Sequence, residues 1–77
     1  MNEKEQNFRK VLGFNIKIAR MQKKLSQEAL AEIAGISTKH VTKIENAGVT
    51  TNVYFIYKIA QALDVTIDEL VTEYKRK

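Results

Sequence analysis

Residues 27–45 read QEALAEIAGISTKHVTKIE, and the spacing of small and apolar residues here indicates two short crossed helices. The residues that would touch at the crossing are Leu30, Ala31, Ala34, Ile36, Val41 and Ile44. Gly35 falls between the two patterns, at a turn that needs positive φ, which glycine adopts without steric cost. The stretch therefore predicts a helix-turn-helix, with helices over 27–34 and 38–46.

The outer face of the second of these helices is polar and basic. Its residues are Thr38, Lys39, Thr42 and Lys43. Lys39 and Lys43 are four residues apart, so they project from one face of the helix. Lysine can donate to guanine O6 and N7, and threonine offers a hydroxyl group and a methyl group for thymine. The N-terminus of the helix adds free N–H groups, which attract phosphate. This chemistry fits a DNA major groove.

The lysines and arginines gather in the same part of the chain as these two helices. Residues 9–43 contain eight of them against two glutamates, a net charge of +6, whereas the whole chain carries +4. Binding to a polyanion requires such a positive surface. By itself this charge would equally fit a solvated, lysine-rich surface, so it supports nucleic-acid binding only because it coincides with the motif.

The remaining composition excludes several other classes of protein. The chain has no cysteine, which removes disulfides, thiolate metal sites and cysteine nucleophiles. His40 is the only histidine, and Asp64, Asp68 and Glu69 are explained by the dipole of a helix that they begin. No apolar run approaches the roughly 20 residues of a membrane span. We therefore expect a soluble, cytoplasmic protein without enzymatic activity, cofactor, metal or small-molecule ligand.

The whole chain, 1–77, is predicted to form a single all-α domain. Helical periodicity and capping residues predict five helices, over 7–23, 27–34, 38–46, 53–63 and 67–75. Residues 1–6 are polar and are expected to be disordered. The predicted caps are Ser26, Ser37, Thr66 and either Thr51 or Asn52, and the inward residues of the fourth helix are Val53, Ile56, Ile59, Ala60 and Leu63.

The stretch from Ile16 to Leu70, 55 of the 77 residues, resembles the Cro/CI-type (XRE) helix-turn-helix family of phage and bacterial repressors. Five segments in register carry the resemblance: Ile16-x-x-x-Arg20, Leu25-Ser26-Gln27-Glu28-x-Leu30-Ala31, Ala34-Gly35-Ile36-Ser37, Val41-x-x-Ile44-Glu45-Asn46 and Lys58-Ile59-Ala60-x-Ala62-Leu63-x-Val65. The resemblance implies a compact, lambda-repressor-like domain with its helix-turn-helix at 26–46. It also implies a transcriptional regulator whose third helix lies in the major groove.

Carried over residue by residue, the resemblance assigns roles at the DNA. Base edges would be contacted by Thr38, Lys39, Thr42 and Lys43. The sugar-phosphate backbone would be contacted by Lys24, Gln27, Ser37, His40 and Asn46. Gln27 would also orient the first base-reading side chain. Arg20 and Glu45 match the internal ion pair of the family, and Gly35 matches its turn.

Two departures from the family pattern have structural consequences. Lys24 stands where the family usually has glycine at the end of the first helix, which predicts a non-glycine residue with positive φ. The loop Ala47–Thr50 lacks the lysine and arginine that the family often carries there, which predicts fewer phosphate contacts.

We expect a sequence-specific regulator that acts as a homodimer on a near-palindromic operator, because one domain makes few base contacts. One alternative is a protein-interaction module, such as an antitoxin or adaptor, that retains the fold. Another is a nonspecific nucleoid or RNA-binding protein, whose binding would depend strongly on salt and show no preferred site. The first helix carries a second apolar stripe of Val11, Phe14, Ile18 and Met21, which either the C-terminal helix and tail or a second copy would cover. A stripe on the fifth helix, Ile67, Leu70, Val71 and Tyr74, is the other candidate dimer surface.

Overall fold

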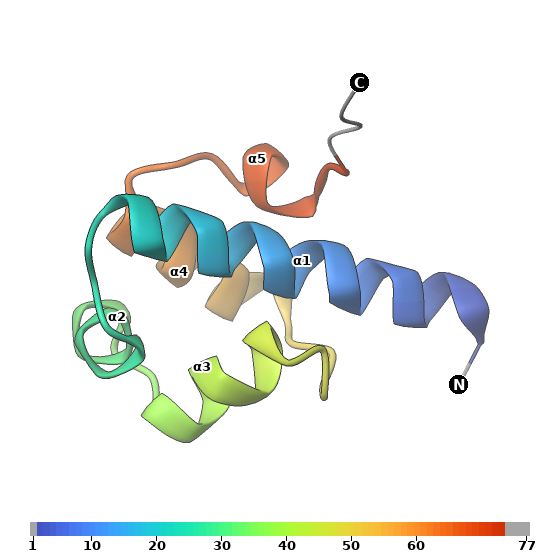
Figure 1. The fold of residues 1–77 in the computed structure, drawn as a ribbon, viewed down its shortest axis with the longest axis horizontal. Helices are drawn as coiled ribbons and strands as arrows, with labels where there is room; N and C mark the ends of the chain where they lie inside the picture. Colours follow the sequence, from blue (N-terminus) through green and yellow to red (C-terminus); the bar gives the residue numbers. More distant parts are fainter. Residues whose placement is uncertain (1, 74–77) are drawn as a thin grey trace.

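The computed structural model describes residues 2–73, which form five helices and no strand (Figure 1). The helices are α1 (Glu3–Gln22), α2 (Gln27–Ala34), α3 (Thr38–Glu45), α4 (Val53–Leu63) and α5 (Ile67–Val71). The long α1 lies between α3 on one side and α5 on the other, and α2 packs on α3 and α4. The all-α, five-helix prediction is confirmed, and α2 and α4 have the predicted bounds.

All five helices contribute to one apolar core. Its fully buried large side chains are Leu12, Ile16, Leu30, Val41, Ile44, Ile59, Leu63 and Leu70. The prediction that Val53 faces inward is wrong, because its side chain is 70% exposed. Val53 is the first residue of α4, one turn before the buried Ile56, and lies beyond the edge of the core.

The helix starts are capped by side chains as predicted. Ser26, Ser37 and Thr66 each accept a hydrogen bond from a first-turn N–H, and Asn52, rather than Thr51, caps α4. Thr66 also forms a full capping box with Glu69. α5 nevertheless ends at Val71, where the prediction extended it to about Lys75, because Thr72 already has extended backbone angles. Lys75 lies outside the described residues.

The start of α1 differs most from the prediction, which left residues 1–6 disordered and began the helix at Asn7. Within the described residues that prediction is wrong, because α1 begins at Glu3. Asn2 caps the helix by accepting a hydrogen bond from the Glu5 N–H at 2.7 Å, and the glutamates of the first turn complement the helix dipole. The Glu5 carboxylate also binds Arg9, four residues along α1, and the distant Thr50, a contact that no local pattern reveals.

Gly13 lets α1 lie directly on the C-terminal end of α3. A Cβ atom at this position would lie 2.5 Å from the Ile44 carbonyl oxygen and 2.8 Å from that of Glu45. These distances are shorter than van der Waals contact, so the close approach of the two helices depends on the missing side chain.

Within residues 2–73, four residues at helix ends adopt the left-handed conformation. Gly35 (φ 73°) follows α2 and Lys24 (φ 58°) follows α1, as predicted. Ala47 and Asp64 were not predicted to have positive φ, yet they end α3 and α4 in the same way. Each non-glycine residue in this region costs about 1 kcal/mol of conformational energy.

Candidate nucleic-acid interface

The short helix α3 is apolar on its inner face and polar on its outer face. Val41 and Ile44 are buried, with 0% and 1% exposure, against the other helices. On the opposite side, Thr38, Lys39 and Lys43 are exposed. The predicted base-reading residues therefore lie on the molecular surface, apart from Thr42, which is half-buried.

The angle between α2 and α3 is fixed by the packing at their crossing. Ala31 and Ala34 are buried there, where a larger side chain would separate the helices. Gly35 reverses the chain in the left-handed conformation, and the Ile36 N–H donates to the Ala31 carbonyl oxygen at 3.0 Å. The helix-turn-helix predicted for 26–46 is thus formed by the residues that predicted it.

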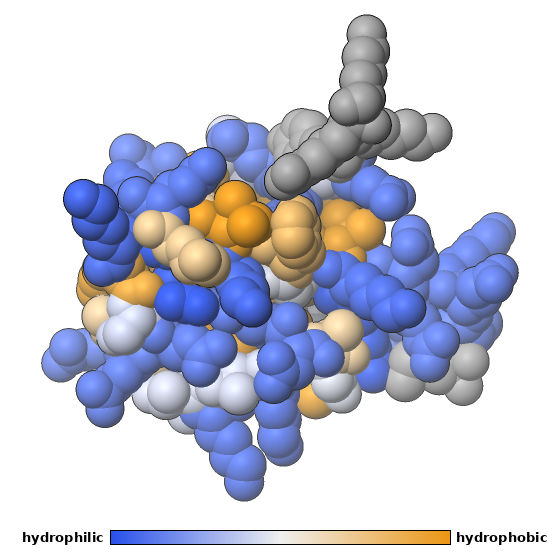
Figure 2. All heavy atoms as spheres, viewed as in Figure 1, coloured by the Kyte–Doolittle hydropathy of each residue, from blue (hydrophilic) through white to orange (hydrophobic). Residues whose placement is uncertain are grey.

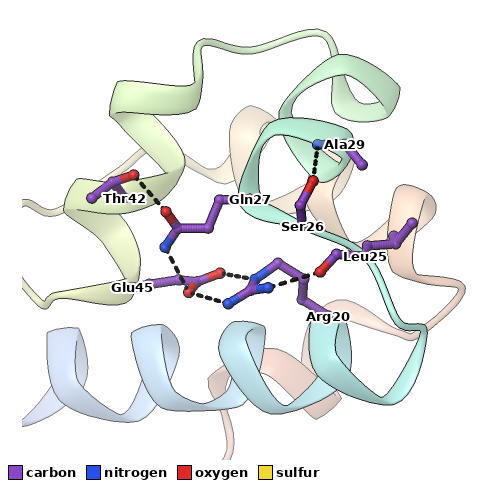
Figure 3. Close-up of polar contacts among 7 residues, drawn as sticks. All are labelled: Arg20, Leu25, Ser26, Gln27, Ala29, Thr42 and Glu45. Carbon is purple, nitrogen blue, oxygen red and sulfur yellow. Dashed lines mark hydrogen bonds and ion pairs between the residues drawn. The ribbon is translucent and has the colours of Figure 1, made fainter.

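An ion pair joins α1 to the end of α3 (Figure 3). Arg20 donates from Nε to Glu45 Oε2 at 2.7 Å and from Nη2 to Glu45 Oε1 at 3.1 Å. Its Nη1 donates to the Leu25 carbonyl oxygen at 2.7 Å. The side chains of Arg20 and Glu45 are 13% and 1% exposed. The predicted structural pair is confirmed, and its two-point geometry orients both side chains.

Gln27 extends this network to the outer face of α3 (Figure 3). Its Nε2 donates to Glu45 Oε1 at 3.0 Å, and its Oε1 accepts from the Thr42 hydroxyl at 2.8 Å. The Thr42 hydroxyl hydrogen is therefore already donated within the protein. The resemblance predicted that Gln27 orients the first base-reading side chain, whereas the bonds observed here join Gln27 to Thr42 and Glu45, 15 and 18 positions away. One Nε2 hydrogen of Gln27 remains for another acceptor.

The other predicted backbone-contacting residues occupy different surroundings. Ser37, Asn46 and Lys24 are exposed at the ends of helices. His40 is half-buried and packs toward α4. Its Nε2 lies 3.0 Å from Thr51 Oγ1, and its ring meets the Phe55 ring edge-on at 5.0 Å between centroids. Only the Nδ1 of His40 is thus left for a further contact.

Residues 2–73 show neither a metal site nor a membrane-spanning helix. No group of three or more histidine, cysteine, aspartate or glutamate side chains there could hold a metal ion. None of the helices formed by these residues is both long and apolar enough to cross a membrane.

The fold and the exposed face of α3 define a helix-turn-helix domain, and comparison with known proteins identifies its family. Residues 16–70 match the helix-turn-helix family HTH_3. The chain therefore belongs to this family of XRE-type transcriptional regulators.

Individual relatives agree with this assignment. The chain is 35% identical over 66 residues to y4dJ, an HTH-type transcriptional regulator of Sinorhizobium fredii, and the match covers 86% of each protein. It is similar in structure to NHTF, a hypothetical transcription factor from Neisseria, with a TM-score of 0.83 and 34% identity over 88% of this chain and 78% of that one. The restriction-modification controller protein C.AhdI from Aeromonas hydrophila gives a TM-score of 0.78 and 32% identity, over 80% and 94% of the two chains.

Proposed function

We propose that this regulator binds double-stranded DNA in a sequence-specific manner and inserts α3 into the major groove. The observation that carries the proposal is the exposure of Thr38, Lys39 and Lys43 on a helix whose opposite face is fully buried. A rigid helix fixes the positions from which these side chains project toward base edges.

The network around Gln27 suggests a division of roles among the polar residues. Thr38, Lys39 and Lys43 would donate to base edges. Thr42, whose hydroxyl is held by Gln27, would contact a thymine through its methyl group. Phosphates would be bound by Lys24, Ser37, Asn46, the remaining Nε2 hydrogen of Gln27 and the Nδ1 of His40.

Lys43→Ala tests base reading. The preferred duplex is first selected from a random pool. We then expect the variant to bind that duplex about 1–3 kcal/mol more weakly, with relaxed preference at one position of each half-site. Binding is measured by fluorescence anisotropy on selected and random duplexes at fixed salt. Lys17→Ala is the control, because it removes the same charge from an exposed position on α1. It should weaken binding to the selected and random duplexes by the same factor. Equal losses for Lys43→Ala on both duplexes would assign Lys43 to phosphate instead.

We further propose that two copies bind a near-palindromic operator as a homodimer. Two reading helices about 34 Å apart meet successive major grooves on one side of the duplex. The candidate surface is a groove of about 670 Å³ between α1 and α5. Its apolar lining comprises Val11, Phe14, Ile18, Ala19, Val65 and Leu70. In Figure 2, apolar side chains gather over α1 and α5 and are bordered by polar ones.

The charges at the rim of this groove favour a second copy as its occupant. Lys10 lies on the α1 wall, whereas Glu69 and Glu73 line the α5 side. In a two-fold arrangement the same patch faces itself, so Lys10 of each copy can approach the glutamates of the other. An apolar centre with a rim of complementary charge is typical of a protein interface.

Phe14→Glu tests this dimer surface. Phe14 is 51% exposed and lines the groove, so a charge there should disrupt association while the core stays intact. Sedimentation at micromolar concentration should show two chains for the wild type and one for the variant. Met21→Glu is the matched control, because Met21 is 54% exposed on the same helix and does not line the groove. A wild type that stays monomeric both free and on DNA would contradict the dimer. If selection from the random pool yields no preferred duplex, the protein-interaction or the nonspecific-binding alternative is favoured.

A further inference from the structure

The N-terminal half of α1 precedes the part of the chain that matches the family, and it contacts the loop between α3 and α4. Arg9 donates from Nε to Thr50 Oγ1 at 2.8 Å and from Nη1 to the Gly48 carbonyl oxygen at 3.3 Å. Both acceptors lie in the loop that follows α3, the helix proposed to enter the major groove. One side chain of α1 therefore binds this loop at two points.

The Glu5 side chain binds both Arg9 and Thr50. Glu5 Oε2 accepts from Arg9 Nη2 at 3.0 Å and from the Thr50 hydroxyl at 2.9 Å. We call Glu5, Arg9 and Thr50 the loop clamp. The Arg9 side chain is only 14% exposed, so it is held within the clamp. The hydrogen bonds from Thr50 and Arg9 favour the charged carboxylate and lower the pKa of Glu5.

The clamped loop offers backbone donors in place of cationic side chains. Residues 47–51 contain no lysine or arginine. The backbone N–H groups of Val49, Thr50 and Thr51 donate to no acceptor within residues 2–73. Backbone N–H groups are common ligands of DNA phosphates. They bind more strongly when the loop is already ordered, because ordering a loop during association opposes binding.

We propose that Glu5 and Arg9 are positioning residues for DNA binding, which hold the 47–51 loop in the shape that presents its N–H groups to phosphate. This inference rests on the proposed function, since it needs a DNA backbone beside the end of α3. Neither residue touches DNA in this account. They act through Thr50 and the Gly48 carbonyl group.

The test compares Glu5→Ala with Glu3→Ala on the selected duplex. Each variant removes one negative charge from the same turn of α1, but Glu3 has no hydrogen bond or ion pair to another of the residues 2–73. Removing a negative charge favours binding to a polyanion, so electrostatics alone predicts equal or tighter binding for both. We expect Glu3→Ala to bind as tightly as the wild type or more tightly. We expect Glu5→Ala to bind about three- to tenfold more weakly than the wild type, because the loop must then be ordered on binding.

Amide hydrogen exchange of the free proteins supplies the second measurement. Exchange of residues 47–51 should accelerate in Glu5→Ala and stay unchanged in Glu3→Ala. Both measurements are made at a temperature where circular dichroism shows each variant to be folded, so a general loss of stability would not change the affinity. Should Glu5→Ala fail to fold, Thr50→Val removes the shared hydroxyl group while keeping the side-chain shape.

The outcomes separate this inference from the proposed function. Equal affinities for the two alanine variants would overturn the positioning role. Tighter binding by Glu5→Ala than by Glu3→Ala would also overturn it, because Arg9 would then act as a phosphate-binding cation that Glu5 restrains. A wild-type protein that binds no duplex would refute the proposed function, whereas the exchange data would still report whether the clamp orders the loop.

Discussion

Glu45→Ala is expected to lower the free energy of unfolding by about 3–5 kcal/mol. The substitution leaves the guanidinium of Arg20, 13% exposed, with the Leu25 carbonyl oxygen as its remaining partner among those observed. A buried charge without its counter-ion is strongly destabilising, whereas the intact pair itself adds little net stability. A domain of this size has a total stability of about 4–12 kcal/mol, so the expected loss is a large fraction of it.

Urea denaturation followed by circular dichroism at low temperature measures this effect. Glu32→Ala is the control, because Glu32 is exposed on α2, and its substitution should change stability by less than about 0.5 kcal/mol. The double variant Arg20→Met with Glu45→Leu should regain most of the loss, since it leaves neither charge buried. A loss below about 1 kcal/mol for Glu45→Ala would mean that Arg20 finds water, and that the pair does not fix α3.

Gly13→Ala should destabilise the fold by about 3 kcal/mol, although alanine is the better helix former by about 1 kcal/mol. The added methyl group would meet the backbone oxygens of Ile44 and Glu45 at 2.5 and 2.8 Å, and neither can move without shifting α3. A lower free energy of unfolding for Gly13→Ala would therefore show that helix packing outweighs helix propensity at this position.

The same urea titration measures this second effect. Gly48→Ala is the matched control, because its new Cβ would come no closer than 3.4 Å to the Lys43 carbonyl oxygen. That distance is ordinary contact, so we expect a change within about 1 kcal/mol. Stabilisation by Gly13→Ala would show that α1 and α3 separate easily at this crossing.

The features that were predictable from the sequence depend on neighbouring residues or on the family pattern. Gly35 and the caps Ser26 and Ser37 act within one helical turn of themselves, and their chemistry predicted their conformations. The positive φ of Lys24 was predicted from the family pattern instead. The pairing of Arg20 with Glu45 spans 25 residues, and it was found only because the resemblance supplied it.

Most of the missed features depend on contacts between distant segments, although the early start of α1 also had a local signal in its cap Asn2 and in the acidic residues Glu3 and Glu5 of its first turn. The early start of α1 is tied to Thr50, which lies 45 residues from Glu5. The turn of His40 toward Thr51 and the use of the Thr42 hydroxyl by Gln27 also arise only in the folded chain. Which bases and phosphates the site residues contact stays a prediction, because those roles require DNA.

The position of α1 between α3 and α5 has a consequence for the operator. One continuous helix of 20 residues carries the proposed pairing surface on one side and holds the reading helix on the other. In the proposed dimer, no linker within residues 2–73 would separate the pairing surface from α3, so the distance between the two α3 helices would be fixed by α1. Each base pair inserted between the half-sites of the proposed operator would rotate one half-site by about 34° around the duplex axis. A dimer paired through α1 would follow that rotation poorly, because the same continuous helix holds α3.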